Sequence, residues 1–167
     1  GGCGSWLVCK EFDSVGVVLS AINSFEGRCI EKKISLRLNN HTEHSIVHAD
    51  KTKIEQVIYN LLDNAIKFTS ENKSIYVTLT EKHDKIFVSV KDEGCGIPKE
   101  SLNRVWVRFY KADHSRGKDK QGTGLGLAIT KEIIKAHNEN INVVSTEGVG
   151  SEFTFSLSKA TTDSEQS

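Results

Sequence analysis

The segment DKTKIEQVIYNLLDNAIKFT, at residues 50–69, places the strongest constraint on the fold of this chain. Its apolar residues recur at the spacing of one face of an α-helix, and Asp50 or Thr52 can cap the first turn. Another layer of structure must cover an apolar helix face, because that face is unfavourable in water. The predicted core-facing stripe consists of Ile54, Val57, Ile58, Leu61, Leu62, Ala65 and Phe68.

Alternating apolar and polar residues predict the strands that supply this second layer. KISLRL, at 33–38, alternates in this way, and a short strand is expected at 46–48. SIYVTLT and KIFVSV, joined by the polar EKHDK, predict a hairpin. INVVS and SEFTFSL, on either side of TEGVG, predict two further strands.

Two more helices are expected, one near each end of the chain. The first follows Phe12, with Asp13 or Ser14 as its cap, and the second covers 125–137. The apolar positions of the first helix are Val15, Val18, Leu19, Ile22 and Phe25, and those of the second are Leu125, Ile129, Ile133 and Ala136.

The predicted elements follow the order α-β-β-α-β-β-loop-α-β-β, and the alternation in the strands indicates that one sheet face is covered. We therefore predict an α/β (α+β) two-layer sandwich, in which helices cover one face of a mixed sheet. The 167 residues suit one domain, expected at 12–158, with a leader or linker at 1–11 and a disordered tail at 159–167. The irregular, charged stretch at about 97–121 has the length of a lid or binding loop.

Composition narrows the classes of function. Lys+Arg and Asp+Glu balance at 22 each, so net charge gives no argument for binding nucleic acid or an anionic membrane. No apolar run approaches the ~20 residues of a membrane span. The four cysteines lack C-x-x-C or paired-histidine spacing, which predicts free thiols in the cytoplasm rather than a zinc site. The histidines, expected at the surface or at strand ends, are His41, His44, His48, His83, His114 and His137.

The face of the 50–69 helix away from its apolar stripe carries Asn60, Asn64 and Lys67. Taken alone, this pattern is typical of a solvated helix face. Amide oxygens are also neutral, hard ligands for a Mg²⁺ ion that shares its charge with phosphates. A lysine one turn further along supplies a point charge for those phosphates. The face therefore predicts either a solvated surface or a magnesium–phosphate site.

The stretch VKDEGCGIP puts Asp92 at the end of a strand, followed by Gly94 and Gly96. A turn with a capping aspartate is one interpretation. The other is a carboxylate that accepts a hydrogen bond from the exocyclic amine of adenine. Guanine offers an acceptor at that place, so a buried carboxylate would reject it.

GTGLGL contributes Gly122, Gly124 and Gly126 at the start of the last helix. It is not a P-loop, because no Gly-Lys-Ser/Thr closes it, and residue 127 is leucine where a dinucleotide fingerprint requires glycine. Glycines before a helix still allow the backbone to approach a phosphate.

Taken together, these motifs resemble the catalytic ATP-binding domain of two-component sensor histidine kinases. QVIYNLLDNAIKFT is similar to the N box of that family, DEGCGI to its first glycine box, and GTGLGL to its second. RFYKAD resembles the end of the F box, and TEGVGSEFTF the last glycine stretch and strand. The resemblance covers 12–157 and implies the Bergerat ATP-binding fold, shared with DNA gyrase, a heat-shock chaperone and a mismatch-repair protein.

The resemblance also implies roles for individual residues. Asn60 and Asn64 would hold Mg²⁺, Lys67 would contact the phosphates, and Asp92 would bind adenine. Lys111 would reach the γ-phosphate from the lid, whereas Arg108 and Arg116 are weaker candidates. The remaining residues implied to shape the nucleotide site are Phe68, Gly94, Gly96, Ile97, Gly122, Thr123, Gly124, Leu125 and Gly126.

One position departs from the family. Its F box usually reads Ile-Phe-Glu-Arg-Phe, whereas this chain has VWVRF, with Val107 in place of the glutamate. The departure concerns lid docking more than nucleotide binding. An exposed pair of Trp106 and Val107 would equally suit a surface for a partner.

The function implied is a histidine kinase catalytic domain that uses ATP and Mg²⁺. Its partners would be a histidine-bearing dimerisation hairpin, expected N-terminal to Phe12 in the intact protein, and a response regulator. The isolated domain is expected to be monomeric, without contact to nucleic acid or membrane. Gyrase-like relatives carry a glutamate as base for water where this chain has Asn60, so hydrolysis should be slow. The alternatives are a gyrase- or chaperone-like ATPase and a nucleotide-binding regulatory module.

Overall fold

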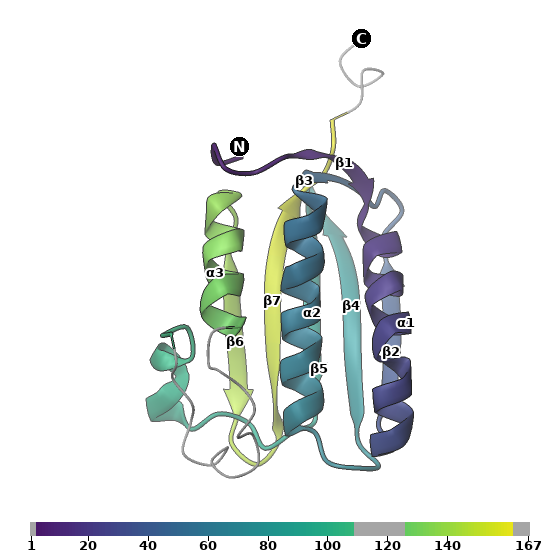
Figure 1. The fold of residues 1–167 in the computed structure, drawn as a ribbon, viewed down its shortest axis with the longest axis vertical. Coiled ribbons are helices and arrows are strands. Elements are labelled where there is room, and N and C mark those ends of the chain that lie inside the picture. Colours follow the sequence, from purple (N-terminus) through teal and green to yellow (C-terminus); the bar gives the residue numbers. More distant parts are fainter. Residues whose placement is uncertain (1–2, 109–125, 162–167) are drawn as a thin grey trace.

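The computed structural model describes residues 3–108 and 126–161. These residues form a five-stranded sheet with three α-helices side by side on one face, and a separate two-stranded sheet (Figure 1). The helices are α1 (Ser14–Lys32), α2 (Lys51–Phe68) and α3 (Gly126–Ala136), and a 3₁₀ helix, η1, spans Lys99–Arg104. The strands are β1 (Lys10–Asp13), β2 (Ser35–His41), β3 (Ile46–Ala49), β4 (Ser74–Lys82), β5 (Lys85–Asp92), β6 (Ile141–Thr146) and β7 (Gly150–Ser158).

The larger sheet has the strand order β2-β4-β5-β7-β6. β2 runs parallel to β4, and the other neighbouring strands of this sheet are antiparallel. Figure 1 shows α2 in the middle of the helical layer, between α1 and α3. The predicted two-layer sandwich with a mixed sheet is therefore confirmed, as is the β4–β5 hairpin. None of the helices in the described ranges has the length and apolarity needed to span a bilayer.

The centre of the core lies between α2 and the sheet. Apart from Phe68, which is half-buried, the side chains of the predicted α2 stripe are at most 1% exposed. Asp50 caps this helix, as predicted, by accepting a hydrogen bond from the Lys53 amide at 3.3 Å. The buried sheet residues in the same core are Ile75, Val77, Leu79, Ile86, Val88, Val90, Phe153, Phe155 and Leu157.

The buried positions of the outer helices differ in part from those that the sequence predicts. In α1, the Asp13 cap accepts from the Val15 amide at 3.0 Å, but Leu19 is 43% exposed. α1 lies at the edge of the helical layer, so its buried face turns toward Val17 and Ala21 instead. In α3, Ile133 is buried as predicted, and the other buried positions are Ala128, Thr130 and Ile134.

The N-terminal segment packs against the domain, and β1 begins at Lys10, before the predicted boundary at residue 12. The Gly4 amide donates to the Ala136 carbonyl at 2.9 Å, and the Val8 amide donates to Asp50 Oδ2 at 2.9 Å. Cys3 and Cys9 form a disulfide, whereas Cys29 and Cys95 are not disulfide-bonded. The prediction of four free thiols was therefore wrong for the first pair, because a turn within the segment brings these two cysteines together.

His137 also differs from its prediction as a surface or strand-end residue, because it is buried at 6% exposure. Its Nε2 accepts a hydrogen bond from the Asp50 amide at 3.0 Å, and its Nδ1 lies 2.8 Å from the Ile133 carbonyl. The pattern requires the proton on Nδ1, since Nε2 is the acceptor. His137 therefore links the end of α3 to the start of α2.

A buried carboxylate between α3 and β6 contacts side chains of β5 and β7. Glu139, 5% exposed in its side chain, lies 2.7 Å from Lys85 Nζ and accepts hydrogen bonds from the Ser156 and Ser158 hydroxyls, each at 2.6 Å. Burial would raise the pKa of Glu139, but these hydrogen bonds outweigh burial and hold the pKa below its ordinary value.

We expect Glu139→Gln to lower the free energy of unfolding by about 2 kcal/mol at neutral pH, because Lys85 loses its buried ionic partner. The folded-state pKa lies below the unfolded value of ~4.3, so this stabilisation is present above that value. It is lost as the pH falls through the folded-state pKa. Urea unfolding at pH 7 and in acid measures the difference, with exposed Glu26→Gln as the control. An equal loss at both pH values would contradict this role.

Candidate functional site

The predicted site residues on α2, β5 and α3 gather at one end of the sheet, the lower end in Figure 1. α2 and β5 both end there, and α3 begins nearby. The arrangement follows from the topology, because β5 returns antiparallel to β4, which itself starts shortly after α2 ends.

Asn60 lies between α2 and α3. Its side-chain amide donates to the Gly126 carbonyl at 3.2 Å and to Thr130 Oγ1 at 3.3 Å. Both bonds use the nitrogen, so Oδ1 remains available to a further partner. The structure thus brings together two residues predicted from separate motifs, Asn60 and Gly126, and adds Thr130, which the sequence reasoning missed.

Asn64 lies one turn further along α2 and is half-buried. Its side chain makes no hydrogen bond to the described part of the chain. Both amide oxygens of the pair therefore fit a cation that takes hard oxygen ligands, such as Mg²⁺.

Lys67 is held by an acidic neighbour that the sequence reasoning missed. Its Nζ lies 3.1 Å from Asp63 Oδ2, and Arg28 from α1 lies 2.8 Å from Asp63 Oδ1. Burial would raise the pKa of Asp63, but the hydrogen bonds from Arg28 and Lys67 outweigh it and lower that pKa. The spacing of four residues between Asp63 and Lys67 was the available signal, since such pairs are neighbours on a helix.

Asp92 ends β5 and is buried at 5% exposure. Its Oδ1 accepts hydrogen bonds from the amides of Gly94, at 2.9 Å, and Ser151, at 3.3 Å. Oδ2 has no hydrogen-bond donor within residues 3–108 and 126–161. Burial raises the pKa of Asp92 to about 6, although the two amide hydrogen bonds act in the opposite direction.

The loop after Asp92 depends on the absence of side chains. A Cβ on Gly94 would lie 2.5 Å from the Phe68 carbonyl oxygen and 2.8 Å from Asp92 Oδ1. Gly96 has a φ of +72°, which favours glycine. The Ile97 amide then donates to Ser145 Oγ at 2.7 Å. Phe68 and Gly94 therefore lie beside Asp92, whereas Gly96 and Ile97 contact the turn between β6 and β7.

The turn between β6 and β7 supports this loop, a role the sequence reasoning did not assign. Ser145 Oγ donates to the Gly150 carbonyl at 3.0 Å, and the Gly148 amide donates to the Cys95 carbonyl at 2.7 Å. A Cβ on Gly150 would overlap the backbone carbonyl oxygen of Asp92. The sequence TEGVG was the available signal, but it contains no side chain that suggests a partner.

The predicted lid is described only up to residue 108. Trp106 is half-buried and packs edge-on against Phe153, with ring centroids 5.6 Å apart, whereas Val107 is 54% exposed. Of the pair expected to be exposed, only Val107 is, because the Trp106 indole packs against the core. Arg108 pairs with Glu132 on α3 at 2.8 Å. The other predicted residues, Lys111, Arg116, Gly122, Thr123, Gly124 and Leu125, lie outside the described residues.

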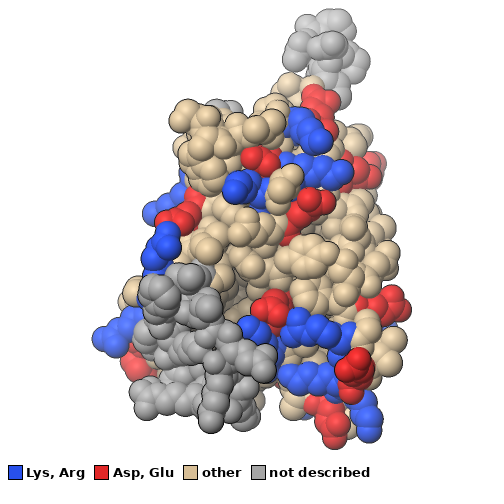
Figure 2. All heavy atoms as spheres, viewed as in Figure 1, with Lys and Arg blue, Asp and Glu red and all other residues tan. Residues whose placement is uncertain are grey.

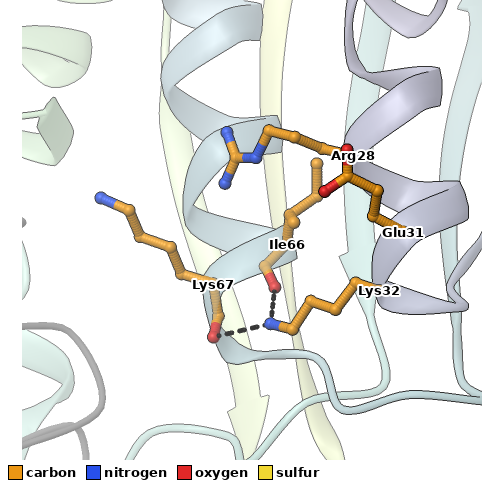
Figure 3. A pocket seen from close by; sticks show the side chains of 5 residues that line it. All are labelled: Arg28, Glu31, Lys32, Ile66 and Lys67. Atoms are coloured by element: carbon orange, nitrogen blue, oxygen red, sulfur yellow. Dashed lines mark hydrogen bonds between the residues drawn. The ribbon is translucent and has the colours of Figure 1, made fainter.

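A pocket of about 410 Å³ lies between the C-terminal ends of α1 and α2 (Figure 3). Lys32 reaches across from α1 and donates to the carbonyls of Ile66 at 2.5 Å and Lys67 at 3.2 Å, which caps the end of α2. Figure 3 shows the Lys67 ammonium extending away from Lys32. In Figure 2, basic and acidic side chains alternate across this end of the molecule. The residues lining the pocket are Arg28, Glu31, Lys32, Ile66 and Lys67.

This pocket is distinct from the predicted nucleotide site. It opens between α1 and α2, whereas Asn60 faces α3, and of the predicted site residues it includes only Lys67. Its basic groups bind the acidic Asp63 or cap a helix, so we assign it a structural role.

Comparison with known proteins identifies relatives of one kind. The family described as histidine kinase-, DNA gyrase B-, and HSP90-like ATPase matches residues 49–161. Sensor histidine kinase WalK of Bacillus subtilis (strain 168) is 42% identical over 113 residues, which are 66% of this chain and 18% of WalK. The chain thus spans about a fifth of the length of such curated relatives.

Solved structures agree. The nucleotide-free catalytic domain of histidine kinase ThkA has a TM-score of 0.81 and 32% identity, covering 92% of this chain and 97% of that domain. Full-length ShkA in complex with AMPPNP has a TM-score of 0.82 and 25% identity, covering 97% of this chain and 34% of ShkA. ThkA in complex with the response regulator protein TrrA has a TM-score of 0.77 and 29% identity, covering 91% of this chain and 42% of that ThkA chain.

Proposed function

Because the chain belongs to the histidine kinase-, DNA gyrase B- and HSP90-like ATPase family, we propose that it binds Mg-ATP between α2, the loop after β5 and α3. The chain is the ATP-binding catalytic domain of a sensor histidine kinase. We propose further that it delivers the γ-phosphate to a histidine on a helical hairpin, for signal transduction.

The main observation that supports the proposed site is that only one of the two carboxylate oxygens of Asp92, Oδ1, accepts hydrogen bonds within the described residues. A buried acceptor without a partner is costly, so the Oδ2 of a 5% exposed aspartate calls for a donor from a ligand. The exocyclic amine of adenine is such a donor, whereas guanine has a carbonyl at the same position. Gly94 keeps the neighbouring surface free of a side chain, so that a flat base can approach.

The other half of the proposed site is built by Asn60 and Asn64. Asn60 is oriented by its hydrogen bonds to α3, which leave its oxygen uncommitted, and Asn64 is uncommitted within the described chain. These oxygens would hold Mg²⁺, which when bound would neutralise charge on the ATP phosphates. Lys67 would supply further positive charge by sharing its ammonium between Asp63 and a phosphate.

The residue at position 60 favours phosphoryl transfer to a protein over hydrolysis. An amide is a poor general base, so Asn60 would not activate water efficiently. Phosphoryl transfer needs mainly alignment and charge neutralisation from the protein. A histidine acceptor supplies its own nucleophilic nitrogen.

The partners are inferred from relatives. WalK is a sensor histidine kinase, and ThkA has been solved with a response regulator. We propose that this domain acts with a histidine-bearing dimerisation hairpin and a response regulator. ATP is a cytoplasmic substrate, so we propose that the domain works in the cytoplasm.

Phosphoryl transfer to a supplied hairpin tests this function. The chain is incubated with Mg-ATP labelled on the γ-phosphate and with the hairpin of its parent kinase. We expect label on the hairpin and slow release of phosphate. A hairpin with its histidine replaced by glutamine is the control. Tight ATP binding without transfer would favour a regulatory module, and rapid hydrolysis would favour a gyrase- or chaperone-like ATPase.

We expect ATP affinity to fall as the pH drops through about 6, where Asp92 becomes protonated and loses its negative charge. Well below that pKa, the affinity contributed by the carboxylate should fall up to about tenfold per pH unit. Calorimetry from pH 5 to 8, at ~25 °C, compares the chain with Asp92→Asn, because the phosphates of ATP also titrate. The ratio of the two affinities should shrink in acid. A constant ratio would contradict the assignment.

A further inference from the structure

Cys3, Cys9 and His48 form a cluster that the nucleotide site does not use. One ligand atom from each, the two Sγ atoms and a ring nitrogen of His48, all lie within 4.8 Å of one another. The two cysteines are half-buried, and His48 is exposed. In the structure the cysteines are joined as a disulfide, and His48 lies beside them on β3.

The surrounding backbone fixes all three positions. The Leu7 amide donates to the Gly4 carbonyl at 3.1 Å, which closes the turn between the cysteines. The Val8 amide donates a hydrogen bond to the Asp50 carboxylate, and the Asp50 amide donates one to His137 Nε2. β1 pairs with β3, and Glu11, which is two residues after Cys9, lies opposite His48.

We propose that these three residues form a zinc site when the cysteines are reduced. Two thiolates and an imidazole are ligands that Zn²⁺ prefers, and water would complete a tetrahedron. The ligand atoms of a tetrahedral zinc site lie roughly 3–4 Å apart, given the usual Zn–S and Zn–N bond lengths. Once the disulfide is reduced, the two sulfur atoms would have to separate from their bonded distance, and His48 would have to move slightly closer to them.

The disulfide and the zinc site exclude each other, because both use the same two sulfur atoms. Two thiol groups of a reductant would deliver two electrons and two protons to the disulfide, breaking its S–S bond and forming two cysteine thiols, while the reductant itself becomes a disulfide. Zn²⁺ would then displace the two thiol protons as it binds. The N-terminal segment would thus have an oxidised form closed by Cys3 and Cys9, and a metal form that is also tied to β3 through His48.

The site is separate from the proposed nucleotide site. β1 and β3 lie at the upper end of the molecule in Figure 1, whereas β5 ends at the lower end. Zinc binding therefore needs no nucleotide, and it can be measured with the metal alone.

The test titrates the full chain with Zn²⁺ against a chromogenic chelator, after reduction with a phosphine that binds zinc weakly. The reduced chain should bind one zinc per chain, and the oxidised chain should bind none. Bound zinc should also protect Cys3 and Cys9 from alkylation, but leave Cys95 reactive. Absence of stoichiometric zinc binding by the reduced chain would overturn the proposal.

A histidine variant separates this site from simple binding by two thiols. His48→Ala should weaken zinc binding by on the order of 100-fold. Removing a residue that only hydrogen-bonds to a metal ligand already lowers metal affinity by about 10- to 100-fold. His41→Ala, an exposed histidine at the end of β2, should bind like the parent chain. Cys9→Ser should abolish tight binding, and circular dichroism checks that each variant folds. Unchanged affinity in His48→Ala would overturn the assignment.

Discussion

Asn64→Ala is expected to remove most of the Mg²⁺-dependent gain in ATP affinity. Mg²⁺ requires near-octahedral coordination by oxygen, and the phosphates and Asn60 cannot replace the missing amide without rearrangement. Removing a residue that only hydrogen-bonds to a metal ligand already lowers metal affinity by about 10- to 100-fold. Removing the proposed ligand itself should lower the affinity at least as much. A titration of ATP binding at increasing Mg²⁺ measures the effect.

Asn64 is the sharper choice of the two asparagines. Asn60 also bonds Gly126 and Thr130, so its replacement would disturb the contact between α2 and α3. Asn64 makes no such contact within the described chain, and Ala is favourable in a helix. Asn23→Ala, an exposed position within α1, is the matched control. Equal Mg²⁺ dependence in both variants would refute the proposed ligand.

Asp92→Asn is expected to reduce the preference for ATP over GTP. The amide can turn its NH₂ group toward a base, where it would accommodate the guanine carbonyl and lose part of the contact with adenine. A mismatched buried polar pair costs about 1–3 kcal/mol, which corresponds to about 5- to 150-fold in affinity. Competition of each nucleotide against a fluorescent ATP analogue gives the ratio.

Asp84→Asn is the control for this experiment, because Asp84 is exposed in the β4–β5 turn, far along the hairpin from Asp92. It removes the same charge without touching the site. If Asp92→Asn retained the preference of the parent chain, Asp92 would be a structural cap of the loop. Its two amide hydrogen bonds would then be its whole role.

The centre of the core could be predicted because apolar residues recur at helical spacing along the whole of α2. Every α2 position predicted as buried lies in the core or at its margin, since this helix packs in the middle of the layer. The same reasoning failed at Leu19, because α1 is at the edge and only part of its surface meets other elements. The periodicity of a sequence gives the face of a helix, but the width of that face depends on its neighbours.

Contacts made across long sequence separations were harder to foresee. His137 was expected at the surface or at a strand end, yet it binds Asp50, 87 residues earlier, because the end of α3 meets the start of α2. Cys3 and Cys9 were expected to be free, since their spacing matches no common motif. Ser145 supports the predicted site through its hydroxyl and Ser151 through its backbone amide, and small polar residues in strands give no distinctive signal.

Two glycines that touch Asp92 have a consequence for how variants of this domain should be judged. Gly94 lies against its carboxylate and Gly150 against its backbone carbonyl, and neither has room for a Cβ. A natural variant with a larger residue at either position would keep the aspartate and still displace it. A comparison of functional side chains alone would find no change in such a sequence. If Asp92 binds adenine as proposed, the nucleotide preference of such a variant would nevertheless change, because part of the specificity would depend on two positions that have no side chain.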